Sequence, residues 1–188
     1  MNIYDFDNTI FKGDSSIKFI KYSLIRHPIL VCWSLLKSLK EIIKYLFKKS
    51  NLGNIKSELF SFVKYLRDFD KYMDMYVIRK QKYIKEFYLK EHKDNDVIIS
   101  ASFDFIIKPF CEKLGIKNVI ATKYDVKNGH IIGINCKGEE KVKRFKKIYP
   151  NEQVKKAFSD SLSDIPMLLL AEDAYLVKGE KLELYKTK

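Results

Sequence analysis

The sequence is poor in the residues that build zinc sites, disulfide frameworks and flexible linkers. Its three cysteines, Cys32, Cys111 and Cys136, are far apart and form no CxxC pair, so neither a zinc site nor a disulfide framework is expected. Only seven glycines and four prolines occur in 188 residues, which excludes long linkers rich in these residues. No secretory signal is visible, so we expect a protein of the reducing cytoplasm.

Long apolar runs are also missing. The longest uncharged stretch, 27–36, is too short to span a bilayer, which requires about 20 apolar residues. Hydrophobic residues nevertheless make up 46% of the chain and charged residues 32%, a composition typical of a folded protein with a packed core. The length suits one catalytic domain, with or without an insertion.

Acidic residues are nearly absent from one part of the chain. Segment 15–57 contains nine lysines and arginines but a single acid, Glu41, and so carries +8 of the total formal charge of +12. A general excess of lysine would not remove the acids from one segment, so the pattern indicates an anionic surface or substrate. Aromatic-basic motifs that would indicate RNA or DNA are missing, and no nucleic acid is expected as a partner.

The spacing of apolar residues divides the chain into two parts. Segment 13–95 has few breakers and apolar positions three and four residues apart, which predicts helices, and Pro28 fits the first turn of one of them. From residue 96, short apolar runs alternate with helical patterns, which predicts a parallel α/β sheet. The expected strands are 97–99, 118–121, 154–158 and 174–177, and the expected helices are 103–114, 138–148 and 161–170.

Two smaller features complete the predicted fold. The first strand, 2–6, is too short to fold alone and must pair with the sheet formed by the second half of the chain. Asn128-Gly129 is flanked by the segments 123–126 and 131–134 and predicts a β-hairpin with a type I′ turn. We therefore expect an α/β core formed by residues 1–12 and 96–188, and an all-helical insertion, 13–95, after the first strand.

Asp5 and Asp7 end the first predicted strand. Residues i and i+2 of an extended chain point to the same side. Two such carboxylates repel each other unless a cation lies between them or one of them is protonated. The alternative is an ordinary turn, because Asp and Asn are common after strands.

A second acidic pair follows a later strand. Asp160 comes just after the predicted strand 154–158, and Asp164 lies four residues further on. The two would share a face if a helix begins here. The alternative is a helix that is capped by Asp160 or Ser161.

Two further residues can contact a phosphate. Ser100 follows the run 97–99, where its hydroxyl and the N-terminus of the next helix can both donate to an anion; the alternative is a serine that caps the helix. Lys141 lies in the first turn of a basic helix, where a cation is unfavourable for the helix dipole. This position indicates a separate role, although lysine is abundant throughout the chain.

The order of these features resembles the haloacid dehalogenase superfamily of hydrolases. The matching motifs are Asp5-Phe6-Asp7-Asn8-Thr9, Ile98-Ile99-Ser100-Ala101-Ser102-Phe103, Gly138-Glu139-Glu140-Lys141-Val142 and Asp160-Ser161-Leu162-Ser163-Asp164. The predicted hairpin, 122–134, is similar to that of subclass IB, which contains the phosphoserine phosphatases. The resemblance covers nearly the whole chain and implies a Rossmann-like core with a helical cap after the first strand.

The resemblance implies a phosphatase mechanism. Asp5 would attack phosphorus and form an aspartyl-phosphate. Asp7 would act as acid and base, a role typically worth ~10²–10⁴-fold in rate. Ser100, Ala101 and Lys141 would hold the phosphoryl oxygens.

The resemblance also implies Mg²⁺ as the cofactor, because this cation prefers oxygen ligands and keeps several waters. Its protein ligands would be the carboxylates of Asp5 and Asp160 and the main-chain carbonyl of Asp7. Asp164 would either bind the ion through water or orient Lys141.

Three neighbouring residues have supporting roles or depart from the family pattern. Thr9 is expected to support the loop rather than to react. Asn8 stands where family members often have Gly or Ser, and Ser159 stands where they often have Gly. Neither departure removes a charged group, so we expect activity to be retained.

The predicted cap, 13–95, would select the substrate. Phosphoserine phosphatases hold the substrate carboxylate with a cap arginine, but Arg67, the nearest candidate here, is not persuasively placed, which argues against phosphoserine. The helix that follows Pro28 has apolar residues on one side and lysines on the other. Such a helix can lie in a membrane interface, or its apolar side can form the internal core of the cap with the lysines in solvent.

A second resemblance favours a lipid substrate. Phosphatidylglycerophosphate phosphatases of the same superfamily have short segments similar to Arg26-His27-Pro28-Ile29-Leu30 and Ser159-Asp160-Ser161. We therefore expect a magnesium-dependent phosphomonoesterase that acts on a lipid phosphate, with its basic cap in peripheral contact with the inner face of the membrane. The alternatives are a phosphatase of a small soluble phosphate, phosphoserine-like or another metabolite, and a non-catalytic basic binding module, against which the four acids argue.

Overall fold

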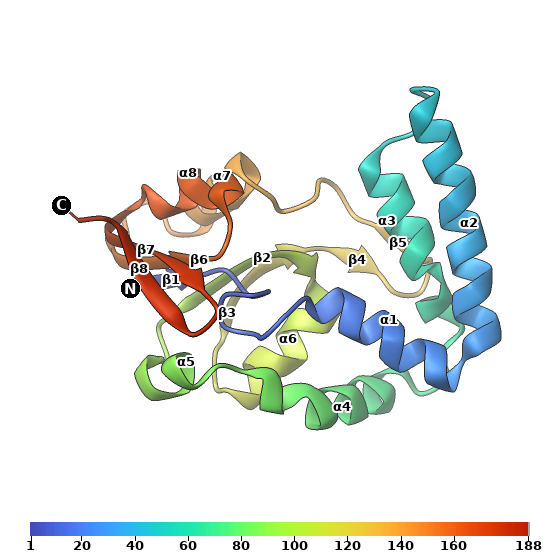
Figure 1. Cartoon of the computed structure of the whole chain (residues 1–188), viewed down its shortest axis with the longest axis horizontal. Coiled ribbons are helices and arrows are strands. Elements are labelled where there is room, and N and C mark those ends of the chain that lie inside the picture. The colour runs from blue at the N-terminus through green and yellow to red at the C-terminus, as the bar shows by residue number, and fades with distance from the viewer. Residues whose placement is uncertain (188) are drawn as a thin grey trace.

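The strands form one mainly parallel sheet (Figure 1). The computed structural model describes residues 1–187, and within them six strands pair in the order β3-β2-β1-β6-β7-β8. Their bounds are β1 (Asn2–Tyr4), β2 (Val97–Phe103), β3 (Asn118–Thr122), β6 (Val154–Ser159), β7 (Ala171–Lys178) and β8 (Lys181–Lys186). Neighbouring strands are parallel except β7 and β8. The predicted α/β fold is confirmed.

The first strand lies in the centre of the sheet. Ile3 pairs with Val97 of β2 on one side and with Ala157 of β6 on the other. Ile3 and Tyr4 are both buried, as expected for a parallel strand that is covered on both faces. The short N-terminal strand therefore pairs with strands from the distant second half of the chain, as predicted.

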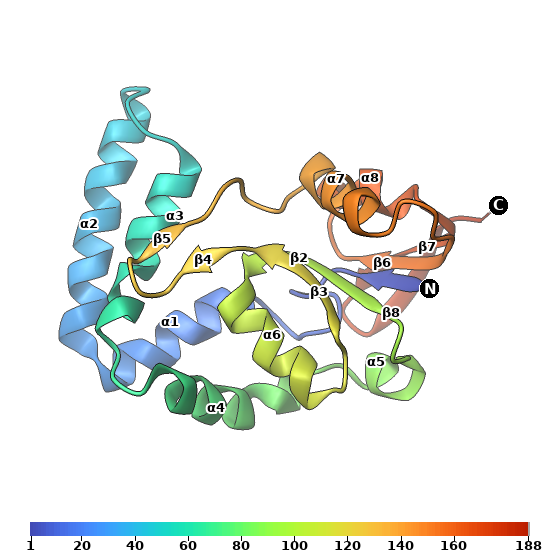
Figure 2. The same ribbon diagram turned by 180° about the vertical axis from the view of Figure 1, so that it is seen from behind.

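Helices cover both faces of the sheet (Figures 1 and 2). Their bounds are α1 (Ser15–Arg26), α2 (Pro28–Leu46), α3 (Leu52–Phe60), α4 (Phe69–Lys80), α5 (Glu86–Glu91), α6 (Asp104–Lys113), α7 (Glu139–Ile148) and α8 (Ile165–Leu168), with 3₁₀ turns at 61–65, 81–83 and 162–164. Helices α7 and α8 lie on one face, and α4, α5 and α6 lie on the other. Alternate strand residues therefore enter different cores: Val97 faces the α7 side and Ile98 the α6 side.

The insertion between β1 and β2 is helical, as predicted. Asp14 caps α1 by accepting a hydrogen bond from the Ile17 amide at 2.8 Å, and Pro28 opens α2. Helices α1, α2 and α3 lie at the end of the molecule that also holds the hairpin of β4 (Tyr124–Asp125) and β5 (His130–Ile131), whereas α4 runs back along α6.

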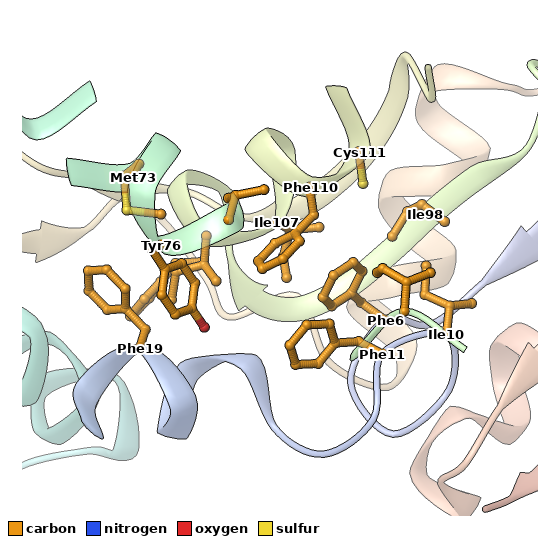
Figure 3. Close-up of a cluster of buried hydrophobic side chains, with 14 of the residues drawn as sticks. Phe6, Ile10, Phe11, Phe19, Met73, Tyr76, Ile98, Ile107, Phe110 and Cys111 are labelled. Atoms are coloured by element: carbon orange, nitrogen blue, oxygen red, sulfur yellow. The ribbon is translucent and has the colours of Figure 1, made fainter. Parts of the chain in front are cut away.

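An aromatic cluster joins the inserted helices to the sheet (Figure 3). Phe19 of α1, Tyr76 of α4 and Phe110 of α6 are buried in one core. The Tyr76 ring is edge-on to both phenylalanines, with centroids 5.1 Å from Phe19 and 5.7 Å from Phe110, a favoured arrangement for aromatic pairs. This packing fixes α1 and α4 relative to the sheet.

Three details of the prediction are wrong. The expected final strand, 174–177, is part of the longer β7, and the antiparallel β8 that follows it was not predicted. The expected helix 161–170 is only a 3₁₀ turn and the short α8. The hairpin turn is not type I′: Gly129 has a φ of 78°, but Asn128 is not among the described residues with positive φ, and type I′ requires positive φ at both.

The apolar side of α2 is not the internal core of the cap, so that interpretation is wrong. Its members, Leu35, Leu36, Leu39, Ile42, Ile43, Leu46 and Phe47, are all exposed. The buried residues of α2 are Val31, Ser34 and Ser38. Within the part of the chain that the structure describes, no helix is long and apolar enough to cross a membrane.

Candidate active site

The carboxyl ends of β1, β2 and β6 open into one pocket of about 390 Å³. These strands are parallel neighbours in the sheet, and ligands of open α/β sheets bind outside the carboxyl ends of the strands. The pocket is lined by every predicted site residue: Asp5, Asp7, Ser100, Ala101, Lys141, Asp160 and Asp164. The fold thus gathers groups from opposite ends of the chain.

The buried ammonium of Lys141 connects two acidic motifs. Its Nζ lies 2.5 Å from Asp5 Oδ1 and 2.7 Å from Asp164 Oδ2. Burial by itself lowers the pKa of Lys141, but the two carboxylates more than offset this effect and the pKa is raised. Lys141 is therefore held as a cation, which accounts for a lysine in the first turn of α7.

Asp5 is buried at the end of β1, where its amide donates to the Phe158 carbonyl at 2.9 Å. Burial raises the pKa of the Asp5 carboxyl to about 7, against the lowering effect of Lys141. Burial also raises the pKa of Asp160. A nucleophilic carboxylate must be ionised, so a further positive charge next to Asp5 and Asp160 would favour the reactive form.

Thr9 links the two acidic loops. Its buried Oγ1 accepts a hydrogen bond from the Asp160 amide at 2.9 Å. The same oxygen lies 3.4 Å from Asp5 Oδ2 and 3.5 Å from Asp160 Oδ1. The two carboxylates therefore converge on one hydroxyl, which matches the supporting role predicted for Thr9.

The loop that follows Asp7 is held by a hydrogen bond from Lys85. Asn8 has a φ of 56°, in the left-handed region that Asn tolerates better than most residues, so the departure from Gly or Ser here is sterically acceptable. The Asn8 carbonyl accepts a hydrogen bond from Lys85 Nζ. Lys85 is buried and also donates to the Gly179 carbonyl at 2.6 Å. Sequence reasoning missed Lys85 because the contact joins positions far apart in the chain.

Asp7 is fixed by hydrogen bonds to both of its carboxylate oxygens. The Ser15 amide, at the start of α1, donates to Oδ1 at 2.6 Å, and the Ser102 hydroxyl donates to Oδ2. Burial raises the pKa of Asp7, while these bonds from Ser102 and Ser15 oppose the rise. Ser102 was not predicted as a site residue, although it lies two residues after Ser100 on the same strand, and residues at this spacing share a face.

One protein family matches this pattern along most of the chain. The profile of the haloacid dehalogenase-like hydrolases matches residues 3–169, which include the whole pocket. The chain belongs to this family.

Curated relatives of this hydrolase match part of its length. It is 32% identical to the protein CicA of Caulobacter vibrioides over 83 residues, which cover 41% of this chain and 37% of that protein. It is also 32% identical over 93 residues to a Mycobacterium tuberculosis protein that carries the name probable phosphatase, covering 45% of this chain and 32% of that protein. The chain thus matches about a third of each relative's length.

Solved structures share the fold over nearly the whole chain. A Bordetella pertussis protein of unknown function superposes with a TM-score of 0.72 at 15% identity, covering 93% of this chain and 87% of that one. A substrate-bound phosphoserine phosphatase superposes with a TM-score of 0.56 at 20% identity, covering 92% and 82%. The predicted family and fold are confirmed.

The residues predicted to bind phosphate, Ser100, Ala101 and Lys141, all line the pocket. Ser100 Oγ is buried and accepts a hydrogen bond from the Ser102 amide at 3.0 Å, which leaves its own O–H to donate. The carbonyl of Ala101 accepts hydrogen bonds from Lys56 Nζ at 2.7 Å and from Thr122 Oγ1 at 2.9 Å. These bonds hold the end of β2 in place beside Lys141.

Lys56 of α3 is a pocket residue that sequence reasoning missed. Its Nζ lies 4.4 Å from the centroid of the Phe103 ring, close enough for a cation–π contact. Burial lowers the pKa of Lys56 to about 8, although Asp7 and Asp14 favour its charged form. In the sequence it was one of nine basic residues in segment 15–57, with no signal that α3 reaches the pocket.

Of the four acids in the pocket, the pair Asp5 and Asp160 suits Mg²⁺ better than all four together. Within residues 1–187, no group of three or more His, Cys, Asp and Glu side chains is arranged to hold a metal ion. Asp164 also accepts a hydrogen bond from Ser159 Oγ at 2.7 Å, which favours its predicted role of orienting Lys141. Asp5 and Asp160 remain as a convergent pair. Because Mg²⁺ typically binds through one or two carboxylates and keeps several waters, this donor set suits it.

Proposed function

We propose that this hydrolase is a magnesium-dependent phosphomonoesterase that works through an aspartyl-phosphate on Asp5. The proposal rests chiefly on one observation: the buried Lys141 ammonium lies 2.5 Å from Asp5 in a pocket that also holds Asp7 and Ser100. A fixed cation beside a carboxylate is the arrangement that draws a phosphoryl group onto that carboxylate and stabilises the charge that shifts during transfer.

In the first step, a carboxylate oxygen of Asp5 attacks phosphorus and the ester P–O bond breaks. Asp7 gives its proton to the departing alkoxide, and the raised pKa that burial gives Asp7 favours the protonated form needed for this. In the second step, the ionised Asp7 takes a proton from a water that attacks phosphorus, and inorganic phosphate leaves with Asp5 free again. Ser100 and Lys141 hold the phosphoryl oxygens throughout.

Mg²⁺ would be held by the carboxylates of Asp5 and Asp160 and the main-chain carbonyl of Asp7. It would supply positive charge that offsets the phosphate and keeps Asp5 ionised. Asp164 would keep the Lys141 ammonium aimed at the phosphoryl group through its 2.7 Å contact.

We propose that the inserted segment, 13–95, acts as the substrate-selecting cap on the core of 1–12 and 96–188. Its Lys56 enters the pocket, so the substrate can carry a polar or anionic group beside the phosphate. A lipid phosphate at the inner, cytoplasmic surface of a membrane is the first candidate, because segment 15–57 carries +8. A small soluble phosphate is the second candidate, in keeping with the phosphoserine phosphatase fold.

A non-catalytic binding module is the remaining alternative, and the pocket argues against it. Asp5, Asp7 and Asp160 would repel a bound phosphate unless a cation offset them. A protein that only retained phosphate groups would have no use for them.

The test is hydrolysis of an aryl phosphate with and without Mg²⁺, by the wild type and by Asp5→Asn. We expect turnover that requires both the metal and Asp5, and a phosphoenzyme that survives acid quenching but is cleaved by hydroxylamine, in the wild type alone. A rate that is independent of Mg²⁺ or of Asp5 would overturn the mechanism. Phosphate release from lipid phosphates in vesicles, compared with a panel of soluble phosphates, then separates the two substrate classes.

A further inference from the structure

Helix α2 packs against the rest of the molecule through its small and polar side. Ser34 and Ser38 are buried, and Ser34 Oγ lies 3.1 Å from Ser61 Oγ of the 3₁₀ turn at 61–65. Helices α1 and α3 and this turn are the elements that α2 contacts most. In both views α2 forms the edge of the molecule farthest from the N- and C-termini (Figures 1 and 2). Its opposite side therefore faces outward.

The outward side of α2 is a continuous apolar stripe, which we name the α2 face. It consists of Ile29, Trp33, Leu36, Leu39, Ile43 and Phe47, all at least 50% exposed. These positions recur three or four residues apart, so they lie on one side of a helix. Folded monomers rarely expose so continuous an apolar surface without an interaction that uses it.

Basic residues border the α2 face. Lys40, Lys44, Lys48 and Lys49 are exposed on α2 and on the turn that follows it. The one acid of this stretch, Glu41, is engaged by Lys44 Nζ and Ser50 Oγ, each at 2.6 Å. The surface thus combines apolar side chains with uncompensated positive charge, which suits a partner that is both apolar and anionic.

An anionic lipid bilayer fits this chemistry better than a second copy of the chain. In a symmetric dimer the same patch meets itself, so Lys40 and Lys48 would face the lysines of the other copy. A bilayer instead offers negative headgroups to the lysines and acyl chains to Trp33 and Leu36. Helix α2 has 19 residues and is about 28 Å long, and no helix within 1–187 is suited to cross a membrane, so α2 would lie in the plane of the interface.

We propose that the α2 face is a docking surface for an anionic lipid bilayer. This surface lies outside the catalytic pocket, and binding of the protein to a bilayer requires no hydrolysis. Only the idea that docking brings the enzyme to a lipid phosphate rests on the proposed function. Docking would concentrate the enzyme at the surface where such substrates are found.

Trp33 is the one tryptophan of the chain and is 59% exposed, so its fluorescence reports docking directly. With the full chain at low salt, we expect a blue shift of emission on addition of phosphatidylcholine vesicles that contain phosphatidylserine, and none with phosphatidylcholine alone. Leu36→Gln/Ile43→Gln should lower the partition coefficient at least tenfold, and Lys40→Gln/Lys48→Gln roughly fivefold per lysine. High salt should weaken binding of the wild type.

The matched control is Ile148→Gln/Leu184→Gln, which removes two apolar residues of similar exposure, 55% and 57%, from the surface of segment 96–188, away from α2. This control should bind vesicles as the wild type does, and all variants should retain the circular dichroism and aryl-phosphate turnover of the wild type. An unshifted Trp33, or equal loss of binding in the control, would overturn the proposal. So would a wild type that ignores vesicles and forms a dimer that Leu36→Gln/Ile43→Gln dissociates, because the occupant would then be a second copy. Loss of turnover in every protein would refute the proposed function alone.

Discussion

The pocket and the α2 face depart from the usual placement of residues in opposite directions. The pocket buries Asp5, Lys141 and Asp164, which belong to residue types that are rarely buried unless paired. Helix α2 buries serines and leaves Trp33 and Leu36 in solvent. Burying charge costs desolvation, and exposing apolar area forgoes hydrophobic stabilisation. Neither arrangement follows from stability alone, so both regions indicate interaction with something outside the chain.

The two regions differ in where their partners lie. In the pocket, Asp5, Lys141 and Asp164 form a buried triad in which every charged group has a partner within the chain, at 2.5 and 2.7 Å. The apolar residues of the α2 face instead point away from the chain. Substitutions in the pocket should therefore affect turnover and stability. Substitutions in the α2 face should affect neither, and should change only vesicle binding.

The largest effect is expected for Asp7→Asn, which keeps the shape of the side chain and removes the proposed acid–base function. The turnover number should fall ~10²–10⁴-fold, while vesicle binding stays that of the wild type. Steady-state hydrolysis of an aryl phosphate in Mg²⁺ measures the loss. A decrease of less than about tenfold would remove Asp7 from the proposed mechanism.

Lys141→Met should have the largest effect on stability, because it leaves Asp5 and Asp164 buried without a counter-charge. We expect the free energy of unfolding to fall by about 3–5 kcal/mol, measured by urea denaturation at neutral pH. The matched control is Lys147→Met, at an exposed position of the same helix, which should change it by less than about 0.5 kcal/mol. Equal stability of the two variants would contradict the buried triad.

Lys56 should make the free energy of unfolding depend on pH in the alkaline range. Its pKa is lowered by burial to about 8 in the folded state, against 10.5 for an ordinary lysine. Between these values the unfolded chain binds more protons than the folded one, so the contribution of Lys56 to stability rises with pH. As the pH rises through this window, the free energy of unfolding of the wild type should increase by on the order of 2–3 kcal/mol relative to that of Lys56→Met. A flat difference would show that the ammonium is not buried.

Thr9→Val should have a smaller effect. It removes the acceptor of the Asp160 amide and leaves the shape of residue 9 nearly unchanged. We expect a loss of about 1–2 kcal/mol in unfolding free energy and a weaker apparent affinity for Mg²⁺, since Asp5 and Asp160 would no longer share a support. Thr187→Val, an exposed control, should change neither quantity.

The smallest effect on stability is expected in the α2 face. Leu36→Gln should change the free energy of unfolding by less than about 0.5 kcal/mol, because Leu36 is 55% exposed. Val31→Gln, on the buried side of the same helix, provides the contrast and should cost about 2 kcal/mol or more. If the two substitutions lower the free energy of unfolding equally, then Leu36 is as buried as Val31, and the α2 face is not an exposed surface.

Much of the candidate pocket could be predicted from the sequence because local rules apply to it. Asp5 and Asp160 directly follow apolar strands, and parallel strands end at the same edge of a sheet. Lys141 was indicated by its unfavourable place in a helix turn. The strand β8 was missed, although Leu182 and Leu184 alternate with polar residues, which is a strand signal. Lys56 and Lys85 could not be assigned, because nothing local distinguishes them from other lysines.

The sequence by itself determined the alternation of strands and helices, the acidic pairs and the stripe of apolar residues on α2. Only the tertiary structure decided that Lys56 enters the pocket, that Asp164 turns to Lys141, and that the stripe faces outward. Periodicity is a local property and shows which residues share a side of a helix. Which side is buried depends on the elements that pack against it, and those come from distant parts of the chain: Ser61 meets Ser34, and no described residue covers Leu36 enough to bury it.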